Sequence, residues 1–425
     1  MYLVFQSSRN KSVAATYDGR SNRKDQSKMA KREVGKRHFL FVMWDGAGGT
    51  IVEARIIKKL LRRGHAVTVL GPAALEDGLR SLGCDYVLDQ AMAPYSSVRD
   101  YPPDELVWLR DHLWLGPARA HAHEVVTTVA RGQADAIVCS GYLYGGMVGA
   151  QASGLPSAAL CTSLYGMPYR ARELPPDDPR RAFWEWGLAA LNDARTSLGL
   201  PELASVFDQR DALDRLLLLT VAALDDQTIR LPANARYVGP PLEEVTNESA
   251  WTVPGPRPTV LISFSTSNQG QGPVVQAVLD ALARHPVHGV VTLGPALGSF
   301  RFRIPENMTA FDHLPHSAVL PGAAAVVTHA GHGTVMAALA YGVPLVCIPQ
   351  GRDQYYVAGR VAAVGAGLVV DRDSAADVIG RALSEVLDHP GFRQHAEQMR
   401  RAIDKTVQSD FTIHELEGLG STAPA

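Results

Sequence analysis

The sequence is poor in features that would tie it to a membrane, to nucleic acid or to an oxidising compartment. Its 425 residues contain four scattered cysteines and no CxxC pair, so we interpret them as small core residues in a reducing compartment. The formal net charge of −2 gives no overall attraction to nucleic acid or anionic membranes. The longest apolar run, residues 216–224, is far too short to span a bilayer, so no integral membrane segment is expected.

The first 37 residues differ in composition from the rest of the chain. They are rich in Ser, Lys, Arg and Asn, poor in apolar residues, and lack the apolar core of a signal peptide. We therefore expect a flexible basic leader over residues 1–37 and a cytoplasmic protein. The whole chain is 46% hydrophobic and 20% charged, which at this length suits a globular protein of two domains.

Strand-like and helical patterns alternate along both halves of the remaining chain. Each half begins with a short apolar run, a loop of small residues and a helical stretch, which is the start of a β-α-β unit. The repetition predicts an α/β fold with two doubly wound, Rossmann-like domains that face each other across a cleft. The expected parts are residues 38–230 (first domain), 231–258 (linker), 259–400 (second domain) and 401–425 (C-terminal segment).

The most informative stretch begins with an apolar run at residues 323–328. It enters a loop broken by Gly331 and Gly333, and a helical pattern starts at Thr334. The free N–H groups of a first helical turn and the helix dipole attract anions. Ligands of α/β folds bind at the ends of strands, and His329 lies at such an end. The pattern therefore predicts a binding site for a phosphate-bearing ligand.

A second apolar run, a proline and the pair Asp353-Gln354 follow this helix. In this order the motif resembles the donor-binding signature of the GT-B glycosyltransferases of the UDP-glycosyltransferase family, especially those of bacterial natural-product pathways. The resemblance implies the GT-B fold over nearly the whole chain after residue 37, with the C-terminal segment crossing back to the first domain. It also implies a TDP- or UDP-linked sugar as co-substrate and no separate cofactor.

The resemblance assigns donor-binding roles by position. The implied donor residues are His329, Gly331, Gly333 and Thr334 at the diphosphate, Asp353 and Gln354 at the sugar hydroxyls, and His313 and Leu314 at the nucleobase. Ser265 or Thr266, in the facing loop, adds hydroxyl donors for the diphosphate. The family often has a stacking tryptophan where this chain has His313, so the sequence leaves the choice of nucleobase open.

The usual catalytic dyad of the family is absent. Its His position falls on Ala47 and its Asp position on Ser140. Asp45 lies in the same first loop, and a carboxylate in a partly dry cleft can have its pKa raised enough to act as a base. We hypothesise that Asp45 is the base; alternatively, it caps the glycine-rich turn or the next helix. The remaining candidates for the base are the substrate itself and three histidines, His112, His121 and His123.

Aromatic residues concentrate in residues 95–123. The first domain builds the acceptor pocket in this family, so the resemblance implies that Trp108, His112 and Trp114 contact the acceptor. Such a pocket suits a flat or macrocyclic apolar molecule. The alternative is that the tryptophans lie on the helix face that packs into the hydrophobic core. The sequence does not decide between these two interpretations.

Two patterns that suggest a metal have simpler interpretations. Asp371-Arg372-Asp373 precedes a helical run and is interpreted as a helix cap. His121 and His123 are two residues apart, a spacing that does not place them on one helix face. No catalytic metal is expected.

Together these features predict an inverting, metal-independent glycosyltransferase. It would transfer a sugar, in particular a deoxysugar, from a TDP- or UDP-sugar to a hydroxyl of a polyketide-like natural product. Three alternatives stay open: transfer to carbon, giving a C-glycoside; a catalytically silent GT-B protein that activates a partner enzyme; and a sugar-nucleotide epimerase. No nucleic-acid partner is expected, and the sequence does not decide whether the protein is a homodimer.

Overall fold

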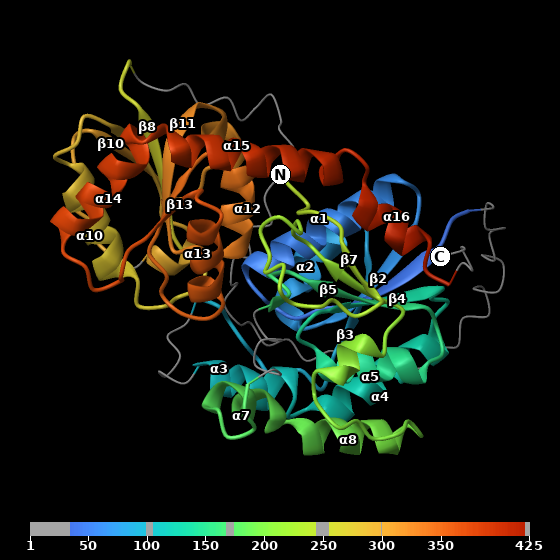
Figure 1. The fold of residues 1–425 in the computed structure, drawn as a ribbon. Coiled ribbons are helices and arrows are strands. Elements are labelled where there is room, and N and C mark those ends of the chain that lie inside the picture. The colour runs from blue at the N-terminus through green and yellow to red at the C-terminus, as the bar shows by residue number, and fades with distance from the viewer. Residues whose placement is uncertain (1–34, 99–104, 167–173, 244–254, 299, 421–425) are drawn as a thin grey trace, which may run out of the picture.

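A computed structural model describes residues 35–98, 105–166, 174–243, 255–298 and 300–420. These residues form two parallel β-sheets with helices packed on both faces (Figure 1), so the predicted fold class is confirmed. Residues 1–34 of the expected leader lie outside the described residues. Within the described ranges, no helix is long and apolar enough to cross a membrane.

The first sheet contains seven parallel strands among the described residues, in the order β3-β2-β1-β4-β5-β6-β7. Leu40 and Val42 of β1 point into a core on one face, and Phe39 and Phe41 point into a core on the other. Because both faces are buried, its central strands are continuous apolar runs. The strands are β1 (His38–Val42), β2 (Ala66–Gly71), β3 (Asp85–Leu88), β4 (Ala136–Ser140), β5 (Ser157–Cys161), β6 (Arg215–Leu218) and β7 (Ala235–Tyr237).

The second sheet repeats this order with six parallel strands in the described part of the chain, β10-β9-β8-β11-β12-β13. Its central strands are also buried on both faces. The strands are β8 (Thr259–Ser263), β9 (His288–Thr292), β10 (Met308–Phe311), β11 (Ala323–Thr328), β12 (Leu345–Cys347) and β13 (Gly367–Val369).

Helices connect the strands and cover the sheets (Figure 1). Those of the first half are α1 (Gly48–Arg62), α2 (Ala73–Ser81), α3 (Glu105–Leu109), the π-helical turn η1 (Arg110–Trp114), α4 (Ala118–Arg131), α5 (Tyr144–Ala152), α7 (Pro179–Glu185), α8 (Leu188–Ser197) and α9 (Asp208–Asp211). Those of the second half are α10 (Gly272–Leu282), α11 (His316–Val319), α12 (His332–Ala340), α13 (Gln354–Ala363), α14 (Ala376–Asp388), α15 (Pro390–Val407) and α16 (Phe411–Glu417), with short 3₁₀ turns at Pro295–Leu297 and Leu320–Gly322.

Both sheets reverse their strand order at an equivalent place. The reversal lies between β1 and β4 in the first sheet and between β8 and β11 in the second. Ligands of such folds bind outside the carboxyl ends of the strands at this switch point. Asp45 follows β1, Ser140 ends β4, Ser265 follows β8 and His329 follows β11. The topology therefore brings these four residues to the switch points of the two sheets.

The chain crosses between the two halves twice. Strand β7 lies within the range expected to be linker, yet it pairs with β6 in the first sheet. At the other end, α15 packs against α12 and leads to α16, whose Ile413 and Leu416 lie in the core of the first sheet. Figure 1 shows α15 extending from the second sheet toward α16 beside the first.

Two helical stretches have their bounds near glycines. Residues 179–197 form two helices, α7 and α8, because the chain turns at Gly187, where a Cβ would lie 2.5 Å from Cδ1 of Leu115. The helix expected to begin at Thr334 begins at His332, so the loop after β11 is shorter than the glycines indicate.

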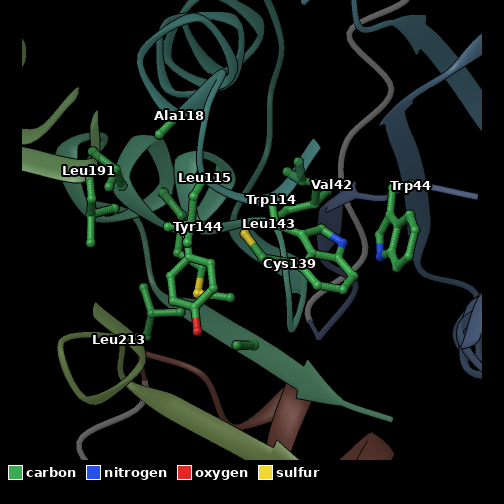
Figure 2. Close-up of a cluster of buried hydrophobic side chains, with 14 of the residues drawn as sticks. Val42, Trp44, Trp114, Leu115, Ala118, Cys139, Leu143, Tyr144, Leu191 and Leu213 are labelled. Atoms are coloured by element: carbon green, nitrogen blue, oxygen red, sulfur yellow. The ribbon is translucent and has the colours of Figure 1, made fainter. Parts of the chain in front are cut away.

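Trp44, Trp114 and Tyr144 lie among the buried hydrophobic side chains of the core on one face of the first sheet (Figure 2). Trp114 is 6% exposed and stacks on Tyr142 and Trp184, with ring centroids 4.9 and 6.0 Å apart. Its edge contacts Trp44, at 5.8 Å. Trp114 is therefore a core residue. Of the two interpretations of Trp114, acceptor contact and packing in the core, the structure shows packing in the core.

Candidate functional site

The loop between β11 and α12 places a histidine close to the start of a helix. His329 is 7% exposed and donates a hydrogen bond to the backbone carbonyl of Ser263, at the end of β8. A Cβ on Gly331 would lie 2.3 Å from Nε2 of His329, so glycine is what allows the imidazole this close to the helix. Ala330 between them adopts a left-handed backbone, with φ 63°. The loop is thus shaped around the position of His329.

Burial is the main influence on the pKa of His329. It lowers this pKa to about 4, with smaller contributions from the Ser263 carbonyl, which raises it, and from Arg352 and His316, which lower it. The imidazole is therefore neutral at pH 7. In the site, the imidazole of His329 therefore acts as a hydrogen-bonding group and carries no charge.

The first turn of α12 offers backbone donors beside this imidazole. No side chain caps the helix N-terminus at Gly331. Gly333 is exposed, with open space where a Cβ would lie, and Thr334 is half-buried. The N–H groups of this turn and the Thr334 hydroxyl can therefore surround a bound anion.

The loop between β12 and α13 brings Asp353 against the first domain. Its Oδ2 accepts a hydrogen bond of 2.5 Å from Oγ of Ser163, which follows β5. Burial raises the pKa of Asp353, opposed by this hydrogen bond and by the charge of Arg352. Asp353 therefore sits at the junction of the two halves.

Gln354 braces the same loop. Its Oε1 accepts hydrogen bonds from the backbone N–H groups of Gln350 (2.7 Å) and Gly351 (3.2 Å). Its Nε2 donates to Oε1 of Gln269 (2.9 Å), whose own Nε2 donates to Oγ of Ser265 (3.2 Å). This chain of hydrogen bonds joins two loops that the sequence analysis assigns to donor binding.

The residues predicted at the nucleobase lie between β10 and α11. His313 is exposed and Leu314 is half-buried against the core of the second domain. The neighbouring His316 contacts Oγ of Ser263 through Nε2 at 3.0 Å, the residue whose carbonyl accepts from His329. Thr266, two residues after Phe264, is half-buried. The predicted donor residues thus lie on loops at one edge of the second sheet.

Comparisons with known proteins agree with this arrangement. Residues 276–408, which include the His329 and Asp353 loops, match the family described as "Erythromycin biosynthesis protein CIII-like, C-terminal domain". The chain is similar to 4'-demethylrebeccamycin synthase of Lentzea aerocolonigenes, with 29% identity over 68% of this chain and 74% of that protein. It is also similar to the TDP-daunosamine transferase DnrS of Streptomyces peucetius, with 27% identity over 70% of each chain. The crystal structure of CalG4, the calicheamicin glycosyltransferase, shares the fold with a TM-score of 0.74 at 22% identity, over 92% of this chain and all of that one.

The chain is a glycosyltransferase with the GT-B fold. In this glycosyltransferase the second domain carries the loops that resemble the donor-binding signature. It departs from the usual family pattern in the first domain, where Ala47 and Ser140 lie at the switch point between β1 and β4 in place of the catalytic dyad.

Asp45 occupies this switch point of the glycosyltransferase. It is half-buried, and its Oδ1 accepts a hydrogen bond of 3.3 Å from the N–H of Ala47, whose backbone is left-handed (φ 53°). Burial raises the pKa of Asp45, and the bond to Ala47 lowers it. Within the described part of the chain no other group donates a hydrogen bond to this carboxylate. Asp45 therefore closes the turn with one oxygen and leaves the other for a ligand.

A second carboxyl group, which the sequence analysis missed, lies at the same switch point. Glu53 of α1 is 3% exposed, and its Oε2 accepts a hydrogen bond of 2.7 Å from Oγ of Ser140. Burial raises the pKa of Glu53 to about 8, so it is largely protonated at pH 7. The signal was in the sequence: Glu53 precedes Ile56, Ile57 and Leu60 by three, four and seven residues, so it shares the buried face of the helix.

The three candidate histidines occupy different surroundings. His121 is buried beside Asp89, with 3.3 Å between Nδ1 and Oδ2, and burial lowers its pKa while Asp89 raises it. His123 is exposed. His112 is exposed and its ring lies 4.9 Å from that of Trp108. Of the three, His112 lies with the aromatic residues predicted to contact the acceptor.

Four side chains form what we name the acceptor wall: Trp44, Tyr95, Trp108 and His112. Tyr95 stacks on Trp108 and contacts Trp44, each with ring centroids 5.9 Å apart. Trp44 and Tyr95 are buried in the same core as Trp114, whereas Trp108 is half-buried and His112 is exposed, so Trp108 and His112 form the accessible face of the wall. Because Trp44 directly precedes Asp45, the wall begins beside the carboxylate that we take as the base.

The residues that suggested a metal have other roles. Asp371 does not cap a helix as expected: α14 begins after Ala375 with no side-chain cap, and Oδ1 of Asp371 accepts from the N–H of Asp373 at 2.8 Å. Among the described residues, no group of three or more His, Cys, Asp or Glu side chains is arranged to hold a metal ion.

Proposed function

We propose that this glycosyltransferase inverts configuration and transfers a deoxysugar, without a metal ion, from a TDP- or UDP-sugar to a hydroxyl of a polyketide-like natural product. The observation that carries the proposal is the loop after β11, where His329 and the uncapped first turn of α12 meet at the switch point of the second sheet. TDP is the favoured nucleotide, because a relative is named as a TDP-daunosamine transferase. The relatives named for rebeccamycin and calicheamicin support a natural-product acceptor.

The reaction assigns one task to each domain. The acceptor hydroxyl oxygen attacks C1 of the sugar from the face opposite the diphosphate, and Asp45 takes its proton. The bond between C1 and the phosphate oxygen breaks as the new C1–oxygen bond forms, which inverts the configuration. The leaving diphosphate stays on the N–H groups of α12 and on His329, where its negative charge is stabilised. Asp353 holds the sugar hydroxyls at the junction between the domains.

The raised pKa of Asp45 supports its role as the base. Burial is the main cause of the shift and makes this carboxylate bind a proton more tightly. A general base works best when its pKa lies near the working pH, so the shift makes Asp45 a better base. The accessible face of the acceptor wall, formed by Trp108 and His112, supplies an aromatic surface for a flat or macrocyclic molecule.

The first experiment is a thermal-shift titration of the wild type and of His329→Ala with TDP, UDP and GDP. A nucleotide at 100 times its Kd stabilises the fold by about 2.7 kcal/mol, which is visible as a higher Tm. We expect TDP to give the largest shift and His329→Ala to weaken TDP binding roughly 10- to 100-fold, as for loss of a hydrogen bond to a charged group.

His389→Ala is the matched control, because His389 is exposed at the start of α15 and away from the donor loops. It should bind TDP like the wild type. If no nucleotide raises the Tm of the wild type, the donor site is wrongly assigned. Hydrolysing the product in acid would separate an O-glycoside, which breaks down, from a C-glycoside, which does not.

A further inference from the structure

The side chain of Arg352 leaves the donor-sugar loop and enters the first domain. Arg352 directly precedes Asp353, and its backbone is left-handed, with φ 54°. This conformation is unfavourable for a residue with a Cβ, and it persists where the surroundings hold the residue in place. The contacts of the guanidinium show what holds it.

The guanidinium forms a two-point ion pair with Glu105 of α3. Nη2 of Arg352 lies 2.6 Å from Oε1 of Glu105, and Nε lies 3.1 Å from Oε2. Nη2 also donates to the hydroxyl of Tyr95 and Nη1 to Oγ of Ser267, both at 3.1 Å. The side chains of the pair are only 20% and 15% exposed. Such a planar, two-point contact fixes orientation as well as distance.

The partners of Arg352 carry the acceptor wall. The hydroxyl of Tyr95 also donates to Oε1 of Glu105, at 3.0 Å. Tyr95 in turn stacks on Trp108 and contacts Trp44 at a tilt. Trp108 follows Glu105 by three residues on α3, which is close to one turn. One guanidinium of the second domain thus orients both the carboxylate and the phenol on which the wall depends.

We propose that Arg352 is a positioning residue, which holds the acceptor wall of the first domain in register with the donor-sugar loop of the second. The inference rests on the proposed function, because it takes the wall as the acceptor site. The sugar is held by one domain and the acceptor by the other, so the distance between their reacting atoms depends on contacts that cross the junction. A misplacement of about 1 Å costs on the order of 100-fold in rate. Arg352 sets acceptor affinity and register, while the donor nucleotide binds elsewhere on the second domain.

Arg360 provides a matched control. It lies on α13, the helix that begins two residues after Arg352, and also reaches the first domain. Its Nε and Nη2 donate to the backbone carbonyls of Leu224 and Asp225, each at 3.0 Å. Arg360 therefore joins the same two domains without touching the acceptor wall. A general loss of adhesion between the domains would affect both arginines alike.

The test compares Arg352→Gly, Arg352→Lys, Glu105→Gln and Arg360→Ala with the wild type. Glycine suits the left-handed backbone at position 352, so this variant removes the side chain without adding strain. The donor probe is TDP, followed by thermal shift. The acceptor probe is alizarin, a flat dihydroxyanthraquinone, followed by quenching of tryptophan fluorescence. Transfer from TDP-glucose to alizarin gives KM for the acceptor and kcat.

Arg352→Gly and Glu105→Gln should weaken alizarin binding and raise its KM roughly tenfold, as expected when a largely buried ion pair loses one partner. Glu105→Gln keeps the charge of Arg352, so its affinity for TDP should stay within about twofold of the wild type. Arg352→Gly removes a positive charge that reaches His329, so its TDP affinity should fall, but less than its alizarin affinity. Arg352→Lys keeps the charge but not the two-point geometry, so it should show an intermediate loss. Arg360→Ala should leave alizarin binding unchanged.

Equal losses in Arg360→Ala and Arg352→Gly would overturn the inference, because adhesion between the domains would then explain them. Unchanged alizarin binding in Arg352→Gly, or a wild type that binds TDP but not alizarin, would also overturn it while leaving the donor site standing. A wild type that binds no TDP would instead contradict the proposed function itself.

Discussion

The two domains share one strand order, yet they encode their chemistry differently. In the second domain, the proposed diphosphate site is a contiguous pattern of a strand, a glycine loop and a helix, with His329 and Gly331 two residues apart. In the first domain, Asp45, Glu53 and Ser140 come from three separate elements and meet only in the fold. Phosphate binding uses backbone N–H groups and therefore needs a local pattern. Proton transfer needs one side chain at one point, which many different elements can supply.

The same contrast separates the part of the site that resembles the family from the part that departs from it. The donor loops carry their predicted residues at the carboxyl edge of the second sheet. At the first switch point Ala47 and Ser140 replace the usual dyad, and a buried Glu53 fills the space beside Ser140. If Asp45 is the base, as we propose, the first domain keeps the position of the catalytic centre while other groups occupy it.

The largest effect should come from Asp45→Asn, which tests the first domain alone. Removing a general base is expected to lower kcat by about 10²- to 10⁴-fold, since the acceptor hydroxyl then loses its proton acceptor. TDP binding should be unchanged, because the donor loops lie in the other domain. The measurements are steady-state kinetics and a TDP thermal shift; a kcat within threefold of the wild type, on the order of normal variation between preparations, would remove Asp45 from the mechanism.

The buried carboxyl of Glu53 should reveal itself in the dependence of stability on pH. Its pKa is raised from 4.5 to about 8 by burial. Between these pH values the unfolded chain loses the proton while the folded protein keeps it, so stability falls as pH rises through this window. Glu53→Gln removes this loss. The variant should gain a few kcal/mol of stability relative to the wild type between pH 5 and pH 8, measured by denaturant unfolding.

Asp77→Asn is the control for Glu53→Gln. Asp77 is exposed on α2, so this variant should follow the wild type at every pH. Parallel stability curves for Glu53→Gln and the wild type would show that Glu53 is not held protonated in the folded protein.

The smallest effects should come from substitutions of the two glycines in the loop after β11. They test whether the first turn of α12 binds the phosphates. In Gly331→Ala the new Cβ would meet Nε2 of His329, so both Tm without ligand and TDP affinity should fall. In Gly333→Ala the Cβ enters open space, so Tm without ligand should not fall. TDP affinity should still fall about tenfold, because the methyl group competes with the phosphates for the N–H groups of the helix.

Gly391→Ala in α15 is the control for both glycine variants, since its Cβ would also meet open space, away from the site. It should leave TDP affinity unchanged and should not lower Tm. If Gly333→Ala binds TDP like this control, the phosphates do not contact the first turn of α12.

Sequence by itself determined the fold class, the repetition of the β-α-β unit and the donor loop, because strand and helix periodicity and the glycine loop are local properties of the chain. It placed His329, Asp353 and Gln354 on the loops where they lie. Only the tertiary structure decided that Trp114 is a core residue, that Glu53 pairs with Ser140, and that Arg352 reaches Glu105 across the domain junction. Arg352 and Glu105 are 247 residues apart. Which side chains meet over such a separation depends on how two domains pack, and that information is not contained in any local pattern.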